Sequence, residues 1–219
     1  MPPVVDRYEL GAFQTNCYVV RAERGAAEAL VIDPGADATM LRLELARMGA
    51  HCAAILLTHS HVDHIGAVAD LAEGLGVQVY MPEAEADVMR NPDGYFRSLG
   101  VSARPYEPDV LLVGGETLEL AGLTLEVVSV PGHSPGHVAY YADGALFSGD
   151  VLFAGSVGRT DLAGASWDVL LESIRTLLDR YPPATIVYSG HGPQTTLATE
   201  LARNPFLGEL RAERAARNP

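Results

Sequence analysis

Short runs of apolar residues bounded by turn-forming residues recur along the first half of the chain and predict β-strands. Three such runs open the chain, at residues 4–10, 18–20 and 29–32, and the third stops at Asp33-Pro34-Gly35. Residues 53–57 are apolar without polar alternation, which is typical of a strand covered on both faces. The first half is therefore expected to contain a sheet with at least one fully buried strand.

Apolar residues at helical spacing predict one helix after the strand at residues 29–32 and another after the strand at residues 53–57. The apolar positions of the first helix are Leu41, Leu45 and Met48. Asp37 is placed to cap its N-terminus, and Gly49 lies where a C-terminal cap belongs. Residues 65–75 repeat the helical spacing and end at Gly76. Residues 82–110 contain several Pro and Gly and are expected to form a short helix and an irregular segment.

The second half of the chain repeats this mixture of strands and helices. The predicted elements are strands at residues 123–130, 137–142, 145–148 and 185–188, and an amphipathic helix at residues 167–180. Asp143-Gly144 indicates a hairpin turn, and the helical residues that follow the last strand are interrupted at Asn204-Pro205. No linker or low-complexity tract divides the chain, so we expect one domain over residues 1–219, an α/β sandwich with its sheets inside and its helices outside.

Charge and composition restrict the function. The chain has 28 acidic and 15 basic residues, a formal net charge of −13 at pH 7. All of the basic residues are Arg, which excludes Schiff-base chemistry and a phosphate-binding loop that uses Lys. The acidic balance argues against nucleic-acid or membrane binding. We find no signal peptide, no spanning apolar stretch and no CxxC pair, and therefore expect a cytoplasmic protein that acts on a small molecule.

Four potential metal ligands lie within six residues, between the buried strand and the helix that follows it. The segment reads Thr58-His59-Ser60-His61-Val62-Asp63-His64. Ligands on one face of a helix would lie three or four residues apart, so this spacing indicates a loop at a strand end. His59 and His61 can face one ion, while Asp63 and His64 reach round the turn towards another.

Three more candidate ligands follow strands in the second half, each preceded by a glycine that permits a tight turn. They are His133, Asp150 and His191. Because functional loops gather at strand ends in α/β architectures, we expect all seven side chains to converge. Imidazole and carboxylate together suit Zn²⁺, Fe²⁺ or Mn²⁺, and five His with two Asp are enough for two ions that share one carboxylate, for which Asp150 is preferred. Such ions lower the pKa of bound water towards ~7, so no side-chain nucleophile is required.

Other residues near these motifs are given supporting or open roles. We expect His137, which begins a strand, to support the ligands or to have a structural role rather than to be a ligand itself, and His51 to lie on the surface. Arg159 could bind a substrate carboxylate or pair with Asp161, and the residues leave both readings open. Three aromatic residues could form walls of a pocket but are expected to be ordinary packing residues: Tyr95, Phe96 and Trp167.

These motifs resemble those of the metallo-β-lactamase superfamily. The resemblance covers nearly the whole chain and includes Thr15-Asn16-Cys17-Tyr18, Ile32-Asp33-Pro34-Gly35, the HxHxDH segment and the three later ligands in order. It implies a four-layer αββα sandwich in which two mixed β-sheets are flanked by helices, with the metals at the edge between the sheets. It also implies two ligand sets bridged by Asp150. The first ligand set is His59, His61 and His133, and the second ligand set is Asp63, His64 and His191.

Within the superfamily, the chain resembles short, single-domain bacterial hydrolases of the glyoxalase II type. The segments that carry this resemblance are 131–137, 158–161 (Gly-Arg-Thr-Asp), 191–193 and 204–207. It implies hydrolysis of a hydroxyacyl thioester such as S-lactoylglutathione with two Zn²⁺ ions per chain, in which Asp63 and Asp150 orient the attacking hydroxide. The chain has no Lys and no C-terminal helical domain of the kind that holds glutathione in full-length glyoxalase II, so the thiol carrier stays open.

The main alternative is a persulfide dioxygenase of the same superfamily. In that family a single Fe²⁺ would use only His59, His133 and Asp150, a ligand set with open positions for O₂. A β-lactamase, a lactonase, a nuclease and a non-catalytic metal-binding module are less favoured. Metal content separates the two leading hypotheses, and the oligomeric state is left open.

Overall fold

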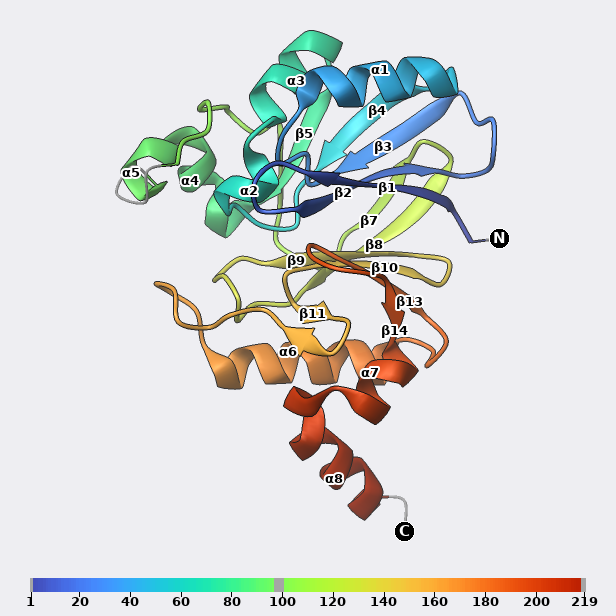
Figure 1. The fold of residues 1–219 in the computed structure, drawn as a ribbon, viewed down its shortest axis with the longest axis vertical. Coiled ribbons are helices and arrows are strands. Elements are labelled where there is room, and N and C mark those ends of the chain that lie inside the picture. Colours follow the sequence, from blue (N-terminus) through green and yellow to red (C-terminus); the bar gives the residue numbers. More distant parts are fainter. Residues whose placement is uncertain (1, 97–100, 218–219) are drawn as a thin grey trace.

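Two large β-sheets lie face to face in the computed structural model, which describes residues 2–96 and 101–217 (Figure 1). The first sheet contains, in order across the sheet, β1 (Val4–Leu10), β2 (Thr15–Arg21), β3 (Glu28–Ile32), β4 (His51–Leu56), β5 (Gln78–Pro82) and β6 (Val110–Leu112). The second contains β14 (Thr195–Thr196), β13 (Ile186–Ser189), β10 (Ala145–Gly149), β9 (Val138–Ala142), β8 (Leu123–Ser129) and β7 (Thr117–Leu120). β11 (Leu152–Phe153) and β12 (Ser156–Val157) form a separate hairpin.

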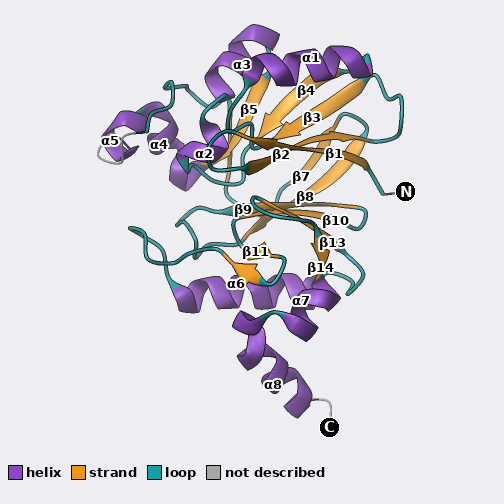
Figure 2. Ribbon diagram, viewed as in Figure 1, coloured by secondary structure: helices purple, strands orange, loops and turns teal. Residues whose placement is uncertain are grey.

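Helices cover the outer face of each sheet (Figure 2). The helices on the side of the first sheet are α1 (Ala38–Met48) and α3 (Val68–Leu75), and those on the side of the second are α6 (Trp167–Arg180), α7 (Leu197–Arg203) and α8 (Gly208–Arg217). Shorter helices are α2 (Val62–Ile65), α4 (Ala86–Arg90), α5 (Pro92–Phe96) and the 3-10 helices Glu83–Glu85 and Pro205–Leu207. The predicted four-layer αββα sandwich with mixed sheets is confirmed.

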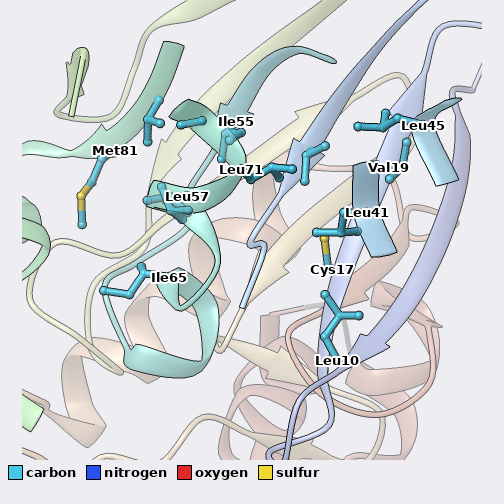
Figure 3. Packing of buried hydrophobic residues seen from close by; sticks show 14 of the residues in the cluster. Leu10, Cys17, Val19, Leu41, Leu45, Ile55, Leu57, Ile65, Leu71 and Met81 are labelled. Atoms are coloured by element: carbon cyan, nitrogen blue, oxygen red, sulfur yellow. The ribbon is translucent and has the colours of Figure 1, made fainter. Parts of the chain in front are cut away.

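Three clusters of buried apolar side chains fill the spaces between the four layers. In the first cluster, Leu41 and Leu45 of α1 pack against Cys17 and Val19 of β2 (Figure 3). A second cluster lies between the sheets and includes Tyr140, and a third packs α6 against the second sheet. Burial of these side chains supplies most of the driving force that holds the layers together.

Strand direction brings the candidate ligand loops to one edge of the sandwich. In the second sheet β8, β10 and β13 run in the same direction, because β9 is antiparallel to both β8 and β10 while β13 is parallel to β10. The loops that leave their ends carry His133, Asp150 and His191. The loop after β4 joins this edge, because the Val138 amide donates to the Thr58 carbonyl across the sheets (2.9 Å).

Several sequence predictions of elements are confirmed. β1 and α6 have the predicted bounds, and Gly49 ends α1 in the left-handed conformation. Asp143-Gly144 forms the turn between β9 and β10, with both residues at positive φ. A type I′ hairpin turn requires that backbone conformation.

Other predictions of elements are wrong. Asp37 precedes α1 but has a left-handed backbone (φ 57°) and makes no capping hydrogen bond, whereas a capping side chain needs an extended backbone. The helix predicted over residues 65–75 is only partly wrong: Val68–Leu75 forms α3 and ends at Gly76 as predicted, whereas Ile65 belongs to the separate helix α2. The two helices are separate because the Ala67 amide donates to the Pro34 carbonyl (3.0 Å) instead of continuing a helix.

The segment 82–110 contains two α-helices and one 3-10 helix where one short helix was predicted, and its residues 97–100 lie outside the described part of the chain. The strands β5, β6 and β7 were missed. β5 ends in Pro82, and the other two have three and four residues, which is too short to display a periodicity. Within the described residues, no helix combines the length and the apolar character needed to cross a membrane.

Candidate metal centre

The ring nitrogens of the first ligand set converge on one point. His59 Nε2 lies 3.0 Å from His61 Nδ1, and His133 Nε2 lies 2.8 Å from the same nitrogen. His59 and His133 are buried, whereas His61 is partly exposed. The structure thus brings together three residues that are up to 74 positions apart in the sequence, as predicted.

The second ligand set gathers beside the first. Asp63 Oδ2 lies 3.3 Å from His191 Nε2 and 3.6 Å from His64 Nε2. The His191 loop is joined to the first sheet by a bridge to Thr15, whose hydroxyl also donates to Asp63 Oδ2 (2.8 Å).

Asp150 lies between the two ligand sets. One of its oxygens, Oδ2, is 3.5 Å from both His133 Nε2 and His191 Nε2. The other, Oδ1, is 3.4 Å from His64 Nε2. A carboxylate with contacts on both sides is in the position predicted for a bridging ligand.

The donor set fits divalent metal ions. His64 Nε2 and Asp150 Oδ1 are fully buried and have no hydrogen-bond partner in the described part of the chain, which is costly unless another group satisfies them. Nitrogen and oxygen ligands bound at about 2.0–2.1 Å in tetrahedral or octahedral geometry lie about 3 to 3.4 Å from one another. The separations observed here are close to this range.

Hydrogen bonds around the centre orient the imidazole rings. The Thr58 hydroxyl donates to Asp33 Oδ2 (2.7 Å) and therefore accepts from the Nδ1–H of His59 (3.0 Å). The Nδ1–H of His133 donates to the Arg159 carbonyl (2.9 Å), and the Nδ1–H of His64 donates to Asp33 Oδ2 (3.0 Å). Each of these rings thus keeps Nε2 free to face the centre, which is how second partners orient histidine ligands at metal sites.

Asp33 is a functional residue that sequence reasoning missed. It is buried, adopts a positive φ of 51° and also accepts a hydrogen bond from the Thr58 amide (2.8 Å). In the sequence, Asp33-Pro34-Gly35 ends a strand and is part of the family resemblance, but no role was predicted for the Asp33 side chain. Nothing in the local sequence indicates that the turn reaches a histidine 31 positions later.

The two ligand sets differ in their electrostatics. Burial lowers the pKa of His59 and lowers that of His61 to about 4, so both rings are neutral. Burial also lowers the pKa of His64 and His191, but the neighbouring carboxylates reverse this effect and raise the pKa of His191 to about 9. Around the second ligand set, protons on histidine therefore balance the carboxylates, and a cation can supply the same positive charge.

The pKa values of the two carboxyl groups complement those of the histidines. Burial raises the pKa of Asp63 and of Asp150, yet the neighbouring His64 and His191 rings bring both below their usual range. Both side chains are therefore ionised and available as ligands.

His137 and Arg159 lie beside the candidate ligands. His137 Nε2 accepts a hydrogen bond from the Asp150 amide (3.1 Å), and its ring stacks on that of His59 with centroids 4.6 Å apart. The exposed guanidinium of Arg159 makes two hydrogen bonds to Asp161, of 2.7 and 2.6 Å. This is one of the two roles left open for Arg159; binding of a substrate carboxylate stays a prediction.

The remaining sequence candidates lie as follows. His51 is exposed at the start of β4, as predicted, and Phe96 is buried as a packing residue. Tyr95 is 53% exposed, so the packing role predicted for it is wrong. Trp167 is 38% exposed and packs against Phe206, with ring centroids 6.4 Å apart.

A cavity of about 290 Å³ lies next to Asp63. Its wall includes Leu10 at the end of β1, Phe13 from the loop between β1 and β2, and Val62 from α2. This cavity offers an apolar surface close to the second ligand set.

The chain belongs to the metallo-β-lactamase superfamily, whose family model matches residues 10–191. Among curated proteins, it is 40% identical to the probable metallo-hydrolase YqgX of Bacillus subtilis, over 92% of this chain and 96% of that protein. It is 35% identical to the hydroxyacylglutathione hydrolase GloC of Haemophilus influenzae, over 90% of this chain and 94% of that protein.

Solved structures give the same result for the fold. The BLEG-1 B3 metallo-β-lactamase is 41% identical, covers 94% of this chain and all of its own, and superposes with a TM-score of 0.88. TTHA1623 in a di-iron-bound form is 40% identical with the same coverage and a TM-score of 0.81. The superfamily of this chain comprises metal-dependent hydrolases, and its fold binds divalent metals.

Proposed function

We propose that the chain is a binuclear metal-dependent hydrolase of small thioesters of the hydroxyacylglutathione class. The observation that carries this proposal is the position of Asp150 within 3.5 Å of both ligand sets. The similarity to GloC supports the substrate class, and the di-iron form of TTHA1623 supports two ions.

In this proposal each ligand set would hold one ion, and Asp150 would be available to both. Ions bound there would supply an ionised water at neutral pH and polarise the carbonyl of the substrate. The donor atoms are compatible with Zn²⁺, Fe²⁺ or Mn²⁺, because His and Asp accept all three.

In this proposal the side chains of the protein orient the attacking water and do not themselves attack the substrate. Asp63 and Asp150 are ionised acceptors at the centre, and they hold the nucleophilic water by hydrogen bonds in the direction of the substrate carbonyl. The Thr15 hydroxyl fixes the rotamer of Asp63. No side-chain nucleophile is needed, which is consistent with the full burial of Cys17 inside β2.

The acyl group of the substrate is assigned to the cavity beside Asp63. Its apolar wall, with Phe13 half exposed, suits a short acyl chain. An anionic thiol carrier would pair with Arg159 by displacing Asp161, since an Arg–carboxylate pair between exposed side chains contributes little stability.

The first test is hydrolysis of S-lactoylglutathione by protein loaded in turn with Zn²⁺, Fe²⁺ and Mn²⁺. We expect turnover that is lost in Asp63→Ala and kept in the control Asp168→Ala, whose carboxylate is exposed at the start of α6. Equal rates for the wild type and Asp63→Ala would contradict the proposal.

Hydrolysis of a β-lactam is a second candidate, because BLEG-1 is named a B3 metallo-β-lactamase and is 41% identical. A chromogenic cephalosporin in the same assay tests it. A third assay, oxygen uptake in the presence of glutathione persulfide, tests the persulfide dioxygenase alternative. One iron per chain together with oxygen uptake would favour the mononuclear persulfide dioxygenase over either hydrolase.

A further inference from the structure

A buried carboxylate joins the two loops that carry the first ligand set. Glu85 ends the 3-10 helix Glu83–Glu85 and is 2% exposed. One of its oxygens accepts a hydrogen bond from the Ser60 amide (2.6 Å), in the loop of His59 and His61. Its other oxygen accepts from the Gly136 amide (3.0 Å) and from the Ser134 hydroxyl, in the loop that begins with His133.

The chemistry of these contacts requires a carboxylate of this length. Both oxygens face N–H donors that cannot reverse their role, so a glutamine would direct its own NH₂ group at one of the two backbone amides. An aspartate is one methylene shorter and cannot span the same two loops. Gly136 permits the approach, because a Cβ there would lie 2.8 Å from Cγ of Glu85.

The second ligand set is held by other groups. His64 is oriented by Asp33, and Asp63 is fixed by Thr15. The loops of the first ligand set are in addition joined by the backbone bond from Val138 to Thr58. Loss of the Glu85 contacts is therefore expected to leave the fold in place and to loosen the ligands on one side of the centre.

We propose that Glu85 is a positioning residue that preorganises the first ligand set. The affinity of His59, His61 and His133 for their ion therefore depends on Glu85, whereas the affinity of the second ligand set for its ion does not. This inference rests on the ligand assignment made under the proposed function. Groups that orient metal ligands through a second contact typically contribute about 10- to 100-fold in metal affinity.

The test is a Co²⁺ titration of metal-free wild type and Glu85→Gln, followed by the visible absorption of the bound ion, with Zn²⁺ competition to obtain dissociation constants. We expect one of the two binding steps to weaken about 10- to 100-fold in Glu85→Gln and the other to be unchanged. The matched control is Glu83→Gln, an exposed residue of the same 3-10 helix, for which both steps should remain as in wild type.

Two background variants assign the binding steps. His191→Ala removes a member of the second ligand set, so the step that remains in that background belongs to the first, and Glu85→Gln should weaken that step. In His61→Ala the remaining step belongs to the second ligand set, and Glu85→Gln should leave it unchanged. Equal weakening of both steps, or no weakening in a folded Glu85→Gln variant, overturns the proposal.

A purely structural role is separated by measuring urea unfolding of the metal-free proteins. Lower stability with unaltered metal affinities would show that Glu85 stabilises the fold only and would overturn the proposal. If Glu85→Gln does not fold, Ser134→Ala removes a single contact and should weaken the same step by a smaller factor; unchanged affinity there overturns the proposal as well. This test uses no substrate, so it remains valid even if the protein does not hydrolyse thioesters. If the wild type binds only one ion, the effect of Glu85→Gln on the first ligand set can still be measured in the His191→Ala background.

Discussion

At the scale of single residues, the candidate ligands could be predicted and their partners could not. His59 to His64 stand out because four donor side chains fall within six residues, a spacing that has a chemical meaning without any structure. Asp33 and Glu85 are ordinary acidic residues in the sequence. Their roles depend on contacts with residues 25 to 51 positions away, which only the folded chain brings about.

Asp33 gives a first prediction at this scale. Asp33→Asn replaces one acceptor oxygen with a donor that faces either the Thr58 amide or the Nδ1–H of His64. We expect the free energy of unfolding of the metal-free protein to fall by about 1 to 3 kcal/mol. The ion held by the second ligand set should bind about 10- to 100-fold more weakly. Urea unfolding and Zn²⁺ competition measure the two effects.

Asp37→Asn is the matched control for this prediction. Asp37 lies four residues further on, is exposed, makes no capping hydrogen bond and has a left-handed backbone that Asn tolerates. Stability and metal affinity should stay at the wild-type values. A similar loss in both variants would show that Asp33 has no special role.

At the scale of elements, periodicity predicts what one segment does alone, and tertiary contacts decide the rest. α6 has the bounds that its amphipathic pattern predicts, because its apolar face is continuous over 14 residues. The break between α2 and α3 was not predicted. It lies where Gly66 approaches the carbonyl of Gly35 so closely that a Cβ on Gly66 would be 2.3 Å from that oxygen.

The contact between the Asp33–Gly35 turn and α2 gives a second prediction. In Gly35→Ala the new Cβ would collide with the carbonyl of Asp63, so α2 must move away from the turn together with Asp63 and His64. We expect at least about 1 to 3 kcal/mol of destabilisation and weaker binding by the second ligand set. Thermal unfolding and metal content after dialysis check this. Gly208→Ala, where the nearest atom is 3.8 Å away at the start of α8, should be neutral or slightly stabilising.

The tail of the chain also positions an element near the centre. Glu200 of α7 accepts hydrogen bonds from the Gly155 amide and the Asn204 side chain (both 2.8 Å), and Asn204 donates to the Ser156 carbonyl (2.9 Å). These contacts hold the β11–β12 hairpin, whose Phe153 lies edge-on against His191 with ring centroids 5.9 Å apart. In the sequence, Asn204-Pro205 interrupts a helix and is part of the family resemblance, but the contacts of the Asn204 side chain were not predicted.

A third prediction concerns this hairpin. Glu200→Ala leaves the Gly155 amide without its acceptor and removes one of the acceptors of the Asn204 side chain, and we expect stability to fall by about 1 to 3 kcal/mol. Amide hydrogen exchange should become faster at residues 152–157 and stay unchanged in α1. Uniformly faster exchange would contradict a local role. Glu209→Ala, at an exposed position at the start of α8, is the control.

At the scale of the whole molecule, the sandwich could be predicted because both halves contain buried strands and amphipathic helices. The contact between the two halves could be predicted only because candidate metal ligands occur in both and were expected to converge. The contacts that unite them, such as Val138 with Thr58 and Thr15 with His191, are backbone pairings without a sequence signature. Not all of the acidic residues contribute surface charge in the folded chain, because Asp63 and Asp150 face the histidines of the candidate metal centre rather than solvent.

A last prediction follows from the origin of the ligands in both halves. The HxHxDH segment belongs to the first half, whereas His133, Asp150 and His191 belong to the second, so ions bound by both would connect the two sheets, and the unfolded chain would have no preformed site for them. Free Zn²⁺ at 100 times the dissociation constant of one site should raise the free energy of unfolding by about 2.7 kcal/mol, and a chelator should reverse the increase. The measurement is urea unfolding at several zinc concentrations, and His191→Ala, which lacks a ligand of the second set, should show a smaller increase at equal free zinc. Stability that does not depend on zinc in the wild type would mean that the seven side chains do not act together as a metal centre, because any ion bound by the folded chain alone must stabilise it by mass action.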